Sequence, residues 1–179
     1  LSNEYELIHL PNKNYKSESI SKYEPLSRSY FKLWEMLSDL KFINKNGDIK
    51  VKLVTLCEGP GGFIEALINW RKMNTKIKDD IFAITLKSTD RDIPGWKKSN
   101  TFLSNNPNVQ ISYGEDNTGN IYRLENMKHF FKQFDLVNDV EVITADGGFD
   151  FSQDFNNQET LSYQIIFCEI VMALSVQKM

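Results

Sequence analysis

The stretch VTLCEGPGGFIEAL, residues 54–67, joins two apolar runs through a turn that contains three glycines and one proline. Glycine permits positive φ angles and lets another group come close to the backbone. A helix after such a turn offers free N–H groups and the positive end of its dipole to an anion. We therefore expect a strand, a tight turn and a helix. The turn either binds a carboxylate or phosphate or serves only as a short connection.

This turn differs from two common nucleotide-binding loops. It does not follow the pattern GxGxxG, and it lacks the lysine of GxxxxGK[ST] that holds a triphosphate. Both a dinucleotide and a nucleoside triphosphate are therefore disfavoured as ligands.

Other apolar runs are spaced like strands, and several are followed by a stretch with helical periodicity. The expected strands are residues 51–57, 81–86, 109–113 and 140–146. The expected helices are SRSYFKLWEMLSDLKF from Ser27, with a stripe of Tyr30, Leu33, Trp34, Leu37 and Leu40, then FIEALINWRKM, NMKHFFKQF and a long helix over residues 158–179. This alternation predicts an α/β fold with a mostly parallel sheet.

Composition limits the classes of protein. The chain of 179 residues, 41% hydrophobic and 25% charged, fits one domain, with residues 1–26 as an N-terminal arm or loop and residues 27–179 as the core. The net charge of −3 gives no global basic field, so any nucleic-acid surface must be local.

The cysteines and the longest apolar run exclude further classes. Two isolated cysteines and two histidines disfavour a disulfide framework or a zinc site, so we expect no metal and a reducing, intracellular compartment. The apolar run IIFCEIVMALSV, residues 165–176, contains Glu169 and is too short to span a bilayer of roughly 30 Å. It predicts a buried helix, and we expect no membrane association.

Three glycine-bearing loops follow expected strands. They are EGPGGF, residues 58–63, GEDNTGN, residues 114–120, and DGGFD, residues 146–150. Ligands of open parallel sheets bind beyond the carboxyl ends of the strands. The three loops therefore predict a site at that edge.

Several segments together resemble a known family. CEGPGGF (57–63), ADGGFDFSQDFNNQE (145–159), VMALSVQKM (171–179), SRSYFK (27–32) and YGEDNTGNIYRLEN (113–126) are similar in order and spacing to the FtsJ-like, Adrift-type cap ribose 2'-O-methyltransferases. The similarity is greatest to versions from large cytoplasmic DNA viruses such as African swine fever virus. It implies a Rossmann-like methyltransferase fold that uses S-adenosylmethionine, with C-terminal strands missing from this chain.

The resemblance assigns the cofactor contacts. It implies that the methionine part lies against Cys57, Glu58, Gly59, Pro60, Gly61, Gly62 and Phe63. The methionine carboxylate is then expected at the N–H groups of Gly62 and Phe63, and its ammonium at carbonyls of the strand end. Glu58 replaces a residue that is often small in the family. It either helps to bind the ammonium or faces solvent.

A second cofactor contact is implied after the third strand. Asn120 and Ile121 match the family's positions, with Asn120 in place of a frequent acidic residue, and Asp116 is a substitute candidate. An amide can accept from the adenine amino group and donate to a ring nitrogen. The alternative for Asp116 and Asn120 is an ordinary polar turn.

The family's catalytic set is Lys-Asp-Lys-Glu, and two positions match. Lys32 corresponds to the first lysine and Asp146 to the aspartate, which would orient Lys32. Taken singly, a helix lysine is usually a solvated charge and an aspartate after a strand is often a helix cap. The second lysine, which is the family's proton acceptor, and the glutamate would lie after Met179. We therefore expect a fragment with an incomplete active site.

The expected substrate is the capped 5' end of mRNA. The resemblance puts Asn156 against it, while Arg28 and the lysines of the N-terminal segment, Lys13, Lys16 and Lys22, are candidate phosphate contacts. Phe149, Phe151 and Phe155 are candidates for base stacking or, alternatively, core residues.

We therefore predict a methyltransferase that acts on the ribose 2'-hydroxyl near the mRNA cap. It would work in the host cytoplasm or virion if viral, and in the nucleus if cellular. Two alternatives stay open at this point: an inactive methyltransferase-like module that binds RNA or a partner, and a 2'-O-methyltransferase of ribosomal or transfer RNA.

Overall fold

The computed structural model describes residues 23–41, 43, 49–73, 75–87, 95–148 and 158–179. Its centre is a four-stranded sheet in the order β3-β2-β1-β4, in which every neighbouring pair is parallel. The strands are β1 (Lys52–Leu56), β2 (Asp80–Ile84), β3 (Val109–Ser112) and β4 (Val142–Ala145). The predicted α/β class and mostly parallel sheet are confirmed.

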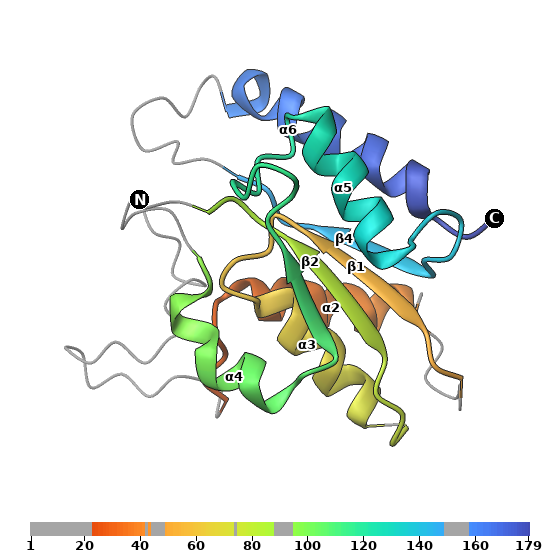
Figure 1. The fold of residues 1–179 in the computed structure, drawn as a ribbon. Helices are drawn as coiled ribbons and strands as arrows, with labels where there is room; N and C mark the ends of the chain where they lie inside the picture. Colours follow the sequence, from red (N-terminus) through yellow and green to blue (C-terminus); the bar gives the residue numbers. More distant parts are fainter. Residues whose placement is uncertain (1–22, 42, 44–48, 74, 88–94, 149–157) are drawn as a thin grey trace.

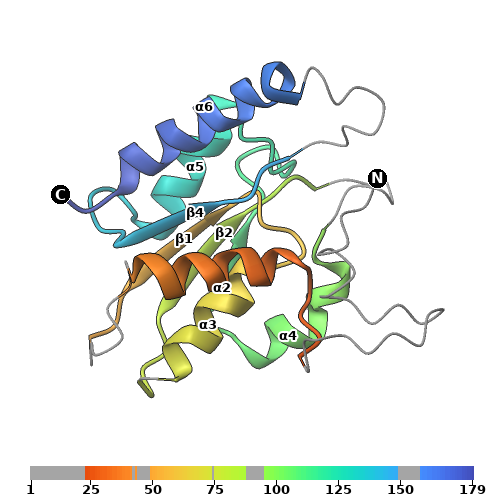
Figure 2. The ribbon, with the colours of Figure 1, turned by 180° about the vertical axis from the view of Figure 1, so that it is seen from behind.

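Helices cover both faces of this sheet. Figures 1 and 2 show α2 (Ser29–Leu40), α3 (Gly62–Lys72) and the short α4 (Asn100–Asn105) on one side, and α5 (Leu124–Phe134) and α6 (Gln158–Val176) on the other. Each face has its own cluster of buried apolar side chains. The two clusters explain why β1 carries apolar side chains toward both faces: Leu53, Val54 and Leu56 are each at most 1% exposed, as expected for a strand covered on both faces.

The chain reverses direction across the sheet at β1. It proceeds from β1 to β2 and β3 on one side, then crosses back through α5 to place β4 on the other side of β1. The carboxyl ends of β1 and β4 lie in register, with Leu56 opposite Ala145. Such a topological switch point is where open α/β sheets bind ligands.

The structure differs from the sequence-based expectations around the helices on the α2 side of the sheet. The polar segment after β2 contains a 3₁₀ turn, η1 (Trp96–Ser99), and α4, neither of which the pattern predicted. Leu40, expected on the buried stripe of the first helix, is 69% exposed because α2 ends there.

The prediction that α6 is a buried helix is wrong on one side. Ile165, Cys168, Met172 and Val176 are buried, whereas Phe167 and Leu174 are 65% and 70% exposed. The helix therefore contacts the sheet along one stripe and presents an apolar stripe outward. Among the described residues, the structure contains no helix with the length and apolar content needed to cross a membrane.

Candidate active site

The glycine turn after β1 is shaped by packing within the chain. Gly61 has a φ of 111°, in the left-handed region, and a Cβ there would lie 3.2 Å from the ring of Trp96. A Cβ at Gly62 would overlap the hydroxyl oxygens of Ser27 and Ser29 at the start of α2. These two glycines are therefore required by the close approach of η1 and α2, and no ligand is needed to explain them.

Glu58 lies inside this turn, and of the two alternatives for its side chain, the one in which it faces solvent is wrong. Its side chain is only 3% exposed, and Oε1 accepts the backbone N–H of Phe63 at 2.6 Å. Burial raises the pKa of Glu58 to about 8, and nearby Asp146 also raises it, whereas the N–H groups of Phe63 and Ile64 and the ammonium of Lys32 lower it.

The methionine carboxylate was expected to bind the Phe63 N–H. That N–H is not open to a ligand carboxylate, because it already donates to Glu58. Glu58 is a carboxylate from the chain itself, and it already occupies this part of the α3 N-terminus. Its other oxygen, Oε2, is buried and has no hydrogen-bond partner among the described residues.

Lys32 and Asp146 form an ion pair at the switch point. Lys32 Nζ lies 2.7 Å from Oδ1 of Asp146, the residue that directly follows β4. The Asp146 backbone N–H donates to the carbonyl of Leu56 in β1, which fixes the carboxylate beside the glycine turn. The side chains are 56% and 27% exposed, respectively. The sequence paired these residues only through a family resemblance, and the fold brings them into contact across 114 positions.

Glu169 links α6 to the same turn. Its Oε1 accepts the N–H of Gly147 at 3.1 Å, and its carboxylate also accepts a hydrogen bond from the Cys57 thiol. Burial raises the pKa of Glu169, although both of these hydrogen bonds lower it. Burial also raises the pKa of the Cys57 thiol, with Glu169 adding to the effect. Glu169 was not predicted as a site residue; its signal was a single charge within the apolar run of residues 165–176.

The loop after β3 is held by a network around Asp116. Its Oδ1 accepts the Thr118 hydroxyl and N–H and the Asn126 amide, and its Oδ2 pairs with Arg123 at 2.7 Å. Hydrogen bonds from Thr118 lower the pKa of Asp116 to about 2. Both carboxylate oxygens thus stabilise the loop itself, which supports the ordinary polar turn as the role of Asp116.

The neighbouring candidates in that loop have different environments. Asn120 Oδ1 accepts the backbone N–H of Tyr122 at 2.9 Å, so its oxygen is part of the local turn. Ile121 is 4% exposed and belongs to the apolar cluster beneath α5 and α6. A cofactor contact at these two positions stays a prediction.

Some predicted RNA contacts lie outside the described residues. These are Asn156, the three phenylalanines at 149, 151 and 155, and the lysines at 13, 16 and 22. Arg28 is described, and it precedes α2 with helical φ and ψ of −63° and −21°. It lies four residues before Lys32, a spacing that puts two helical side chains on one face.

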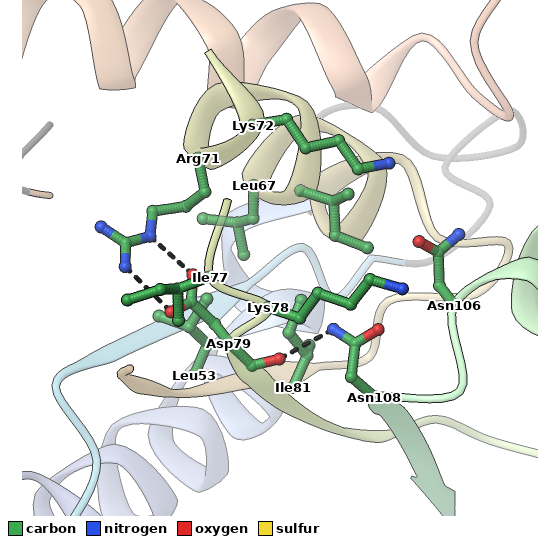
Figure 3. Close-up of a pocket in the computed structure, with 11 residues that line it drawn as sticks. Leu53, Leu67, Arg71, Lys72, Ile77, Lys78, Asp79, Ile81, Asn106 and Asn108 are labelled. Atoms are coloured by element: carbon green, nitrogen blue, oxygen red, sulfur yellow. Dashed lines mark hydrogen bonds and ion pairs between the residues drawn. The ribbon is translucent and has the colours of Figure 1, made fainter. Parts of the chain in front are cut away.

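A small pocket lies at the opposite ends of the strands. It has a volume of about 30 Å³, enough for only a few waters. Figure 3 shows Arg71 and Asp79 side by side in it, joined by bonds of 2.6 and 2.9 Å. Both side chains are about 5% exposed or less. The pocket is too small for a cofactor, and the buried ion pair instead connects α3 to the start of β2.

The fold and this site are those of a methyltransferase. A sequence profile of the FtsJ-like methyltransferase family matches residues 25–178, and the chain belongs to this family. The family resemblance inferred from the sequence is confirmed.

Individual relatives are cap methyltransferases by name. The mouse and human proteins called cap-specific mRNA (nucleoside-2'-O-)-methyltransferase 1 are 37% and 36% identical to this chain over 128 residues. These matches cover 68% of this chain and 14% of each relative. The protein of that name from Trypanosoma brucei brucei is 30% identical over 154 residues, which is 80% of this chain and 36% of the relative. The chain thus spans only a minor part of each relative, and viral origin stays a prediction.

Proposed function

We propose that this chain is part of an S-adenosylmethionine-dependent methyltransferase that modifies the ribose 2'-hydroxyl near the 5' cap of mRNA. The observation that carries the proposal is the ion pair of Lys32 and Asp146 beside the glycine turn at the switch point. Membership of the FtsJ-like family and the names of the relatives support the reaction and the substrate.

The ion pair fits a role in orienting a hydroxyl acceptor. Methyl transfer is an in-line displacement, so the acceptor oxygen must be held opposite the departing sulfur. Asp146 is fixed by its backbone bond to β1 and accepts a charge-assisted hydrogen bond from Lys32. The Lys32 ammonium has two further N–H donors and is about half exposed, so it can reach a ribose hydroxyl. Which residue accepts the proton of the hydroxyl stays a prediction.

The glycine turn fits the methionine part of the cofactor. S-adenosylmethionine would supply an electrophilic methyl group, and its amino-acid end would lie against residues 57–63. The buried, unpartnered Oε2 of Glu58 is the observation that favours a cationic ligand group in this turn. Arg28, four residues before Lys32, is proposed to contact an RNA phosphate on the same face of α2.

The test uses the intact protein, capped RNA and labelled S-adenosylmethionine, with 2'-O-methyl nucleosides counted after digestion. We expect Lys32→Ala and Asp146→Ala each to lower transfer by about 100-fold or more, since both act on the orientation of the acceptor.

A second ion pair provides a matched control. Lys50 and Asp80 lie 2.8 Å apart with side chains 55% and 28% exposed, almost as in the Lys32–Asp146 pair, but at the start of β2. Lys50→Ala and Asp80→Ala should keep transfer within about twofold, because exposed ion pairs contribute little to stability. Equal losses at the two pairs would contradict a catalytic role for Lys32 and Asp146.

The other reactions predicted from the sequence are outcomes of the same assay. Equal transfer to capped and uncapped RNA would favour an enzyme of ribosomal or transfer RNA. RNA binding by the intact protein without any transfer would favour a binding module.

A further inference from the structure

The α3 N-terminus carries its own carboxylate. Phe63 and Ile64 are the second and third residues of α3. Oε1 of Glu58 accepts the Phe63 N–H at 2.6 Å, and the N–H groups of both residues lower the pKa of this carboxyl. These are the donors that a capping side chain usually takes. A negative charge is also stabilised at this end of the helix dipole. A ligand carboxylate would have to displace Glu58 from these N–H groups.

The second oxygen of the same carboxylate is unsatisfied. Oε2 of Glu58 is buried and has no hydrogen-bond partner among the described residues. A buried polar atom without a partner is unfavourable. Protonation does not remove the problem, because the O–H would then be a donor without an acceptor.

The charged and titratable groups around Glu58 come from three elements. Asp146 after β4 contributes a negative charge, Lys32 of α2 a positive one, and the Cys57 thiol lies at the end of β1. Since Lys32 already pairs with Asp146, the cation that acts on Glu58 is shared with another carboxylate. The turn therefore has an unmatched acceptor that suits a positively charged donor.

We propose that Oε2 of Glu58 accepts the α-ammonium of the cofactor's methionine part, while Oε1 stays on the N-terminus of α3. This inference rests on the proposed function and makes it more specific. The chain recognises the amino-acid end of its cofactor at this turn through the ammonium and not through the carboxylate. Glu58 is a cofactor-binding residue in this assignment.

Binding of three thioethers to the intact protein tests the assignment by calorimetry. The probes are S-adenosylhomocysteine, an analogue with hydrogen in place of its ammonium, and an analogue with hydrogen in place of its carboxylate. For the unmodified protein, we expect loss of the ammonium to weaken binding by about 10-fold or more, because a charge-assisted hydrogen bond to a buried oxygen is lost. Loss of the carboxylate should weaken binding less.

The variant Glu58→Gln keeps the size of the side chain and an oxygen for Phe63, but it removes the charge. It should bind S-adenosylhomocysteine about 10-fold or more weakly and bind the ammonium-free analogue as the unmodified protein does. Glu65→Gln is the matched control. Glu65 is a buried glutamate within α3, and it accepts hydrogen bonds from the Tyr23 hydroxyl and the Leu26 N–H. The control should keep the preference for the ammonium.

Proton release gives a second readout that does not depend on activity. With a pKa of about 8, Glu58 is mostly protonated at pH 7, and pairing with an ammonium would ionise it. Binding of S-adenosylhomocysteine at pH 7, measured in buffers of different ionisation enthalpy, should release about one proton. Glu58→Gln should release almost none.

The outcomes separate this inference from the proposed function. Failure of the unmodified protein to bind S-adenosylhomocysteine would overturn both. Equal affinity in Glu58→Gln, or a greater loss on removing the carboxylate than the ammonium, would overturn only the role of Glu58. If Glu58→Gln does not fold, the three probes with the unmodified protein decide the question.

Discussion

Glu169 accepts the backbone N–H of Gly147 at 3.1 Å, one residue beyond the Asp146 carboxylate. The bond connects α6 to the turn that follows β4. Because the same carboxylate also accepts the Cys57 thiol, Glu169 joins the ends of β1 and β4. Its contribution to the site is therefore to position the backbone that carries Asp146.

Replacement of Glu169 should affect the site through that backbone. We expect Glu169→Ala to lower methyl transfer by about 10-fold, since displacement of a catalytic group by a fraction of an ångström is costly. Glu169→Gln keeps an acceptor for Gly147 and should restore most of the lost kcat. Equal kcat in the two variants, with normal folding, would show that the Gly147 bond does not position Asp146.

The glycine turn should depend on Gly61 for stability even without a ligand. Gly61→Ala places a Cβ near Trp96 at a φ of 111°, and we expect a loss of about 1–3 kcal/mol in the free energy of unfolding. Gly95 is the control, because it has an extended backbone and no atom within 4 Å of an added Cβ. Gly95→Ala should change stability by less than about 0.5 kcal/mol. Urea unfolding measures both variants, and similar losses would contradict the packing argument.

The buried ion pair at the far end of the sheet should matter for folding and not for the reaction. Asp79→Ala leaves Arg71 buried without its main partner, so we expect a loss of about 3–5 kcal/mol. Asp80, the next residue, pairs with Lys50 at the surface, and Asp80→Ala should cost less than about 1 kcal/mol. Denaturant unfolding of the two variants decides this, and a small effect at Asp79 would contradict a structural role for the pair.

Glu58 should make stability depend on pH with a defined sign. Its pKa is raised from 4.5 to about 8 in the folded state, so between these values the folded chain binds more protons than the unfolded chain. The free energy of unfolding should therefore fall as pH rises from 4.5 to about 8, relative to Glu58→Gln, by on the order of 4 kcal/mol. Unfolding of both proteins at several pH values measures the difference. A difference that stays constant or grows with pH would contradict a buried, destabilised carboxylate.

Local sequence patterns predicted the sheet well because a parallel strand that helices cover on both faces is mostly apolar. All four expected strands are present; each ends one or two residues before its expected end, and the starts differ from the expected ones by at most two residues. Some strands end earlier than expected because their last expected residues leave the hydrogen-bonded sheet and form the loops of the site. Cys57, expected in the first strand, has a φ of 58° and begins the glycine turn.

The sequence contains no local pattern that predicts η1 and α4 or the orientation of α6. The segment of η1 and α4 is polar, and its order depends on contacts such as the Ser99 hydroxyl with the Pro60 carbonyl. The apolar run of α6 indicated a helix, but periodicity does not say which side of a uniformly apolar helix faces the sheet.

By itself, the sequence determined the α/β class, the position of the glycine turn and, through its family motifs, the pairing of Lys32 with Asp146. Strand and helix periodicity and short motifs are local properties, so they can be recognised in the amino-acid sequence. Only the tertiary structure decided how the turn is used. It buried Glu58 against the start of α3, placed Ser27, Ser29 and Trp96 against the two glycines, and set Glu169 beneath Gly147. Burial and hydrogen bonding between distant segments arise only on folding. They are the reason that the glycine turn, which its sequence suggests is an anion site, presents the Glu58 carboxylate as an acceptor for a cation.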